Sequence, residues 1–87
     1  MNIKRSFHSD RVGSLSRFPN GSHGTIVDVI ADMELQGRLM GMELFTGTRF
    51  QLLRSGTVAS NIPFLLAIGE TRGALDHRIA ELILVKM

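Results

Sequence analysis

Three histidines and a scatter of carboxylates are the side chains of this 87-residue chain that could bind a metal ion or transfer a proton. His8, His23 and His77 lie far apart in the sequence, and Asp76 adjoins only the last of them. A metal site needs several convergent ligands held by supporting hydrogen bonds. We therefore expect surface or turn histidines, no metal and no cofactor. The glutamates are equally scattered and are expected to be solvated: Glu34, Glu43, Glu70 and Glu81.

No catalytic constellation stands out either. The chain has no cysteine, and none of its serines lies in a Gly-x-Ser-x-Gly or Ser-x-x-Lys context. It also lacks the Gly-x-x-x-x-Gly-Lys loop that cradles phosphates. The sequence therefore predicts a non-enzymatic protein that does not bind nucleotide itself.

Charge and hydropathy give only weak information about partners. The net charge is +2, but most cations occur singly and the chain has neither Trp nor Tyr, whereas nucleic-acid sites combine clustered cations with aromatics. No apolar run approaches the roughly 18–20 residues that span a bilayer. We expect a cytoplasmic protein without direct membrane insertion and without a nucleic-acid partner. Nucleic-acid binding by a small basic barrel stays open as an alternative function.

Helical periodicity separates buried from exposed residues in the stretch after Asp32, a candidate N-cap. Leu35, Leu39 and Met42 recur at i, i+4 and i+7 and are expected to face inward. Met33, Met40 and Met42 suit either a core or an adaptable binding surface. The inward stripe leaves Met40 and Phe45 as candidate partner-binding residues.

Two endings of this helix compete. If Glu43 adopts the left-handed conformation, Leu44 can contact Leu39, as in a Schellman motif. If Gly41 adopts it, the contact would fall on Gly37, which has no side chain. The packing favours Glu43, although a left-handed non-glycine residue costs roughly 1–2 kcal/mol. Gly47 is then expected in the turn before the next strand.

The remaining segments indicate a small barrel. Strands are expected at residues 25–30, 49–54, 64–68, 72–75 and 82–85, with a helical turn from Asp76 to Glu81. Alternation along residues 49–54 predicts that Phe50 and Leu52 point inward. Phe64, Leu66 and Ile68 would also point inward, so Leu65 points outward and must be covered by another segment of the chain or by a partner. About five short strands, with one helix between the first two, favour closure because closure hides exposed edges. We expect residues 1–13 to be an arm and residues 14–87 to be the barrel domain.

The order of these motifs resembles the FeoA family (ferrous iron transport protein A). The matching positions are Leu15, Phe18, Gly21, Gly24, Ile26, Arg38, Leu39, Met42, Leu44, Gly47, Thr48, Gly69, Ala74, Leu75, Ala80, Ile83 and Val85. Glu43 and Thr46 depart from it, standing where the family usually has Gly and Pro. Gly21, Leu39, Leu44, Gly47 and Gly69 are taken as structural motif residues.

The resemblance implies an SH3-like β-barrel and an accessory role in bacterial ferrous iron uptake. Its implied partner is the cytosolic part of a FeoB-type membrane transporter, and the expected partner-binding residues are Met40, Phe45 and Leu65. Direct sensing of ferrous ions is a further alternative. The oligomeric state stays undetermined by the sequence.

Overall fold

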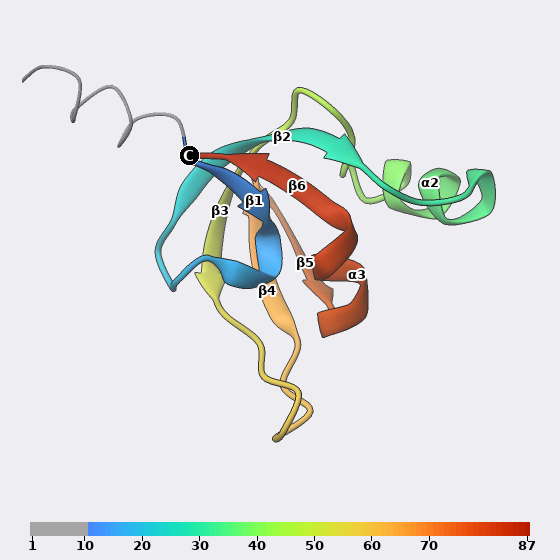
Figure 1. Cartoon of the computed structure of the whole chain (residues 1–87). Coiled ribbons are helices and arrows are strands. Elements are labelled where there is room, and N and C mark those ends of the chain that lie inside the picture. Colours follow the sequence, from blue (N-terminus) through green and yellow to red (C-terminus); the bar gives the residue numbers. More distant parts are fainter. Residues whose placement is uncertain (1–10) are drawn as a thin grey trace, which may run out of the picture.

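Strands dominate the protein, in a computed structural model that describes residues 11–87 (Figure 1). The strands are β1 (Val12–Ser14), β2 (His23–Val29), β3 (Arg49–Arg54), β4 (Phe64–Ile68), β5 (Thr71–Leu75) and β6 (Ile83–Lys86). The helical segments are the 3₁₀ turn η1 (Leu15–Arg17), α2 (Met33–Met40) and α3 (His77–Leu82). All strand pairs are antiparallel, in the sheet order β1-β6-β2-β3-β4-β5. This is the predicted SH3-like barrel, with α2 between β2 and β3.

Strand β2 curls the sheet, because its two halves pair with different neighbours. Residues 23–25 pair with β3, whereas residues 25–29 pair with β6. The register with β6 shifts between Ile26 and Asp28, and a second shift interrupts the β3–β4 pair between Leu52 and Arg54. Bulges of this kind bend a strand and increase its twist. The sheet therefore rolls up (Figure 1), and the face that it encloses carries the buried apolar side chains.

That apolar face forms a single core. The inward positions predicted on β3 and β4 are confirmed, since all of them are buried: Phe50, Leu52, Phe64, Leu66 and Ile68. They pack in one cluster with Leu15, Phe18, Ile26, Leu39, Leu44, Leu75, Ala80, Ile83 and Val85. No polar or charged side chain of the described residues is buried. The side chains of the core are therefore all aliphatic or aromatic.

The C-terminal end of α2 follows the first of the two predicted alternatives. Glu43 has a positive φ of 64°, while Gly41 is right-handed. The Leu44 N–H donates to the Leu39 carbonyl at 2.9 Å, and the Glu43 N–H donates to the Met40 carbonyl at 2.9 Å. These are the two hydrogen bonds of a Schellman motif. Burial of both Leu39 and Leu44 outweighs the strain at Glu43.

Both helices also begin as the sequence predicts. The Asp32 carboxylate accepts a hydrogen bond from the Leu35 N–H at 2.8 Å, and the Asp76 carboxylate accepts one from the Ile79 N–H at 2.9 Å. Each bond satisfies a backbone donor that the first helical turn leaves unpaired. Leu35 and Met42 are only partly buried against the core, so Leu39 alone among the three inward residues is fully enclosed.

The turn before β3 depends on Gly47, whose φ is 96°. Its N–H donates to the Ile26 carbonyl at 2.7 Å, and the Ile26 N–H donates to the Thr48 carbonyl at 2.8 Å. This pair of bonds attaches the chain leaving α2 to β2. Gly21 and Gly69 also have positive φ values, of 85° and 60°.

One strand was not predicted. β1 contains Val12 and Gly13, so the sheet begins inside the segment expected to be an arm, while residues 1–10 of that segment lie outside the described residues. Val12 pairs with Lys86 and Ser14 with Leu84. Three residues carry no usable periodicity, and pairing with distant β6 is what makes them a strand.

Replacing Gly47 by Val should lower the free energy of unfolding by roughly 1–3 kcal/mol, because a β-branched side chain resists a positive φ. Chemical denaturation measures the change. Gly47→Asn is the matched control and should lose less, since Asn tolerates the left-handed region better. Equal stability of the Val variant and the wild type would mean that the turn does not require a positive φ at residue 47.

Candidate functional site

Two of the three predicted partner-binding residues lie on one surface. Met40 and Phe45 are 59% and 44% exposed, and both line a hollow of about 100 Å³ together with Val29, Gln36 and Thr46. Leu65 lies elsewhere, half-buried on β4, where its register neighbours are Arg54 on β3 and Ala74 on β5. The structure therefore brings Met40 and Phe45 together and leaves Leu65 apart.

The surface around Met40 extends to Met33, which the sequence leaves open between the core and a binding surface and which is not among the predicted partner-binding residues. Met33 is 89% exposed and lies seven residues before Met40 on α2, hence on the same side of the helix. Gly37 stands between them, and a Cβ there would meet nothing within 4 Å. Ile30, just before the helix, is also exposed. We call Ile30, Met33, Met40 and Phe45 the α2 surface. The seven-residue spacing of Met33 and Met40 is the sequence signal that could have placed both methionines on one side of the helix.

Charge is segregated along the molecule. Residues 28–44 carry four carboxylates, on Asp28, Asp32, Glu34 and Glu43, against the single cation Arg38, a net charge of −3. The other described residues carry seven Arg or Lys and three Asp or Glu, a net charge of +4. The exposed apolar residues of the α2 surface therefore lie in an acidic region of a basic protein.

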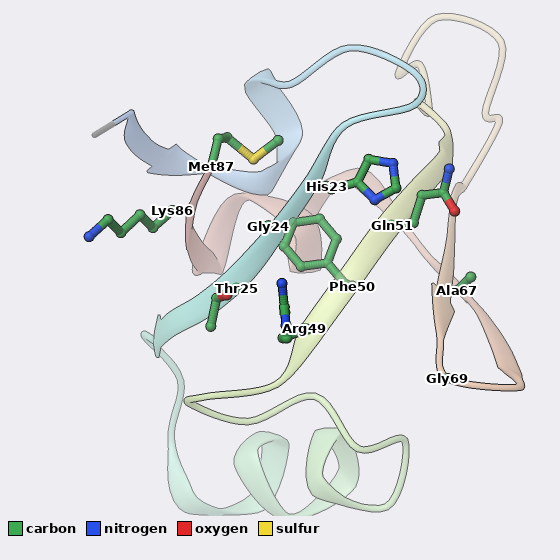
Figure 2. Close-up of a pocket in the computed structure, with 10 residues that line it drawn as sticks. All are labelled: His23, Gly24, Thr25, Arg49, Phe50, Gln51, Ala67, Gly69, Lys86 and Met87. Atoms are coloured by element: carbon green, nitrogen blue, oxygen red, sulfur yellow. The ribbon is translucent and has the colours of Figure 1, made fainter. Parts of the chain in front are cut away.

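A basic hollow of about 660 Å³ lies at the other end of β2 (Figure 2). Figure 2 shows His23, Gly24 and Thr25 of β2 beside Arg49, Phe50 and Gln51 of β3, with Lys86 and Met87 from the C-terminal end of the chain. None of the described residues that line this hollow is acidic. Such a surface attracts anionic groups through its electrostatic potential. Arg49 and Lys86 are the charged residues that supply it.

The histidines fall in different places. His23 lines the basic hollow, and His8 lies outside the described residues. His77 approaches Glu81 on α3, with Nε2 and Oε1 3.8 Å apart, and its ring packs against Phe64. This i, i+4 pair has a helical spacing for two metal ligands, but it was not among the metal sites considered from the sequence. Among residues 11–87 no group of three or more His, Asp or Glu side chains could hold a metal ion.

In residues 11–87, no helix has the length and apolar character to cross a membrane. Exposed apolar side chains gather on the α2 surface, and others lie singly on β1 and β2 and in the β3–β4 loop: Val12, Val27, Val58 and Ile62. The geometry therefore offers two surfaces for binding, one apolar and acidic, the other basic.

Comparison with known proteins identifies the domain that carries these surfaces. The family model described as the FeoA domain matches residues 13–87. Among curated proteins, none matches the chain significantly.

Solved structures match over most of the chain. A crystal structure of an iron uptake regulatory protein (FeoA) is 25% identical with a TM-score of 0.79, covering 87% of this chain and 97% of that one. The solution structure of a FeoA protein from Chlorobium tepidum is 23% identical with a TM-score of 0.73, covering 85% of this chain and 69% of that one. A manganese-dependent transcriptional repressor, 19% identical with a TM-score of 0.77, covers 88% of this chain and 42% of its own. The last two show the fold alone.

Gly24 shapes the basic hollow, so Gly24→Ala should lower the free energy of unfolding by about 1–3 kcal/mol. A Cβ there would lie 2.6 Å from the Lys86 carbonyl oxygen and 3.2 Å from the Phe50 ring. Thermal denaturation measures the loss. Gly37→Ala, which meets open space, is the control and should gain stability because Ala favours a helix. A neutral Gly24→Ala substitution would contradict this packing.

Proposed function

Since the chain belongs to the FeoA domain family, a family associated with ferrous iron transport, we propose that it is a non-enzymatic accessory protein of ferrous iron uptake. It acts in the cytoplasm and docks on the cytosolic part of a FeoB-type transporter. The observation that carries this proposal is the α2 surface, which exposes Met33 and Met40 on a helix outside the barrel and Phe45 in the segment that follows this helix.

The chemistry of the α2 surface suits protein docking. Methionine is flexible and polarizable, so Met33 and Met40 can adapt to a partner groove. Phe45 provides an aromatic anchor of the kind that contributes strongly at interfaces. The neighbouring carboxylates of Asp32, Glu34 and Glu43 steer the surface toward a basic partner and discourage acidic ones. We expect the complementary site to be an apolar groove with a basic rim.

Docking would regulate the transporter by shifting its conformational equilibrium. A bound protein shifts such an equilibrium only by the difference in its affinity for the two states. A tenfold difference corresponds to about 1.4 kcal/mol. Regulation therefore requires a site that changes shape or accessibility between transporter states, and an invariant site would give attachment only.

The double variant Met40→Asp with Phe45→Ala should bind the transporter at least about 10-fold more weakly, since truncating each hot-spot residue typically costs more than about 1 kcal/mol. Biolayer interferometry on the detergent-solubilised transporter and on its isolated cytosolic domain measures the affinity. The wild-type chain should bind with a dissociation constant of about 50 µM or lower.

Val58→Asp is the control, because Val58 is exposed in the β3–β4 loop away from the α2 surface. It should bind like the wild type. Absence of wild-type binding to both forms of the transporter at about 100 µM overturns the docking proposal. Unchanged binding of the double variant overturns the assignment of the surface.

A further inference from the structure

The outer edge of β5 carries backbone groups without partners in the described part of the chain. β5 stands at the end of the sheet order and pairs only with β4. No hydrogen bond joins the other side of residues 71–75 to any described residue. A strand edge with unpaired N–H and C=O groups is a template for another extended chain.

An apolar cavity of about 160 Å³ opens beside this edge. Its walls are aliphatic and come from β4, β5 and the segment after α2: Met42, Leu44, Leu66, Ile68 and Leu75. Thr71, Arg72 and Gly73 complete the lining on β5. A dry cavity of ~150 Å³ accepts a group the size of benzene, so this one can take the side chain of Leu or Met.

Gly73 connects the edge to the cavity. It pairs with Leu66 on β4, and Leu66 points into the core. Residues opposite one another on neighbouring strands point to the same face of a sheet. On a strand added to the outer edge of β5, the residue opposite Gly73 therefore points inward, to the side where the cavity lies and where Gly73 contributes no side chain.

We propose that β5 receives an extended segment of a partner protein as an additional strand, anchored by an aliphatic side chain that enters the cavity opposite Gly73. Arg72 is exposed on the outward face of the same strand. The residue opposite Arg72 is the immediate neighbour of the anchor, and opposite charges across strands stabilise pairing. The recognised segment therefore has an aliphatic residue next to an acidic one.

A second copy of this chain fits the edge less well. Antiparallel pairing of two β5 strands centred on Gly73 places glycine opposite glycine and leaves the cavity empty. Centring on Arg72 opposes two arginines, which is unfavourable. Centring on Ala74 would need Leu75 of the other copy as the anchor, and Leu75 is buried in its own core. A different protein segment is therefore the better occupant.

A selection of random linear nine-residue peptides displayed on phage, with the full chain as bait, tests the inference. Enriched peptides should carry an aliphatic residue beside Asp or Glu. When such a peptide binds, the protein amide NMR signals that shift should be centred on residues 71–75. The enriched peptides should bind Gly73→Val at least about 10-fold more weakly, because the added side chain fills the cavity. Gly73→Val must first show a wild-type-like melting transition, since its Cβ would lie 3.1 Å from the Met42 methyl group.

Arg72→Glu supplies a second test that leaves the aliphatic walls of the cavity unchanged. Because Arg72 is exposed, the variant should fold normally, and selection on it should replace the acidic neighbour by Lys or Arg. Three outcomes would overturn the inference: no enrichment on the wild-type chain, enriched peptides that perturb residues outside β5, or a dimer of the chain alone in sedimentation velocity that Arg72→Glu abolishes. The inference is independent of transporter docking through the α2 surface, so either proposal can fail alone.

Discussion

The hydrogen bond from the Leu44 N–H to the Leu39 carbonyl, formed between two buried leucines, is the constraint on which both proposed binding surfaces depend. Helix α2 buries only Leu39 fully and stands outside the barrel (Figure 1). An eight-residue helix containing a glycine has little stability of its own. Its position therefore comes from the turn that follows it, where the strain at Glu43 is offset by the burial of Leu44.

That turn positions two apolar features of the molecule, one that projects into solvent and one that is a cavity. On its outer side, Met40 and Phe45 flank it and form part of the α2 surface. On its inner side, Met42 and Leu44 form walls of the cavity beside β5. The same short segment thus shapes a surface that projects from the molecule and a cavity that receives a side chain. Changes at residues 41–46 are expected to alter both.

The fold alone leaves the function open, because a manganese-dependent transcriptional repressor shares it with an iron uptake regulatory protein (FeoA). The function must therefore be argued from the side chains that this chain places on the surface of the barrel. The acidic character of residues 28–44 opposes the basic hollow of Arg49 and Lys86 at the other end of β2. Two surfaces of opposite charge allow different partners to be recognised on one small barrel.

Local rules settled much of this structure in advance. Alternation along β3 and β4 predicted the inward Phe50 and Leu66, the capping role of Asp32 followed from its side chain, and spacing favoured a left-handed Glu43. These features depend on neighbours within a few residues, so the sequence by itself determined them. Strand β1, the separation of Leu65 from Met40 and the cavity at Gly73 depend on pairings between distant segments. Only the tertiary structure decided them, because the sequence pattern shows which residues are apolar but does not show which strands pair with one another.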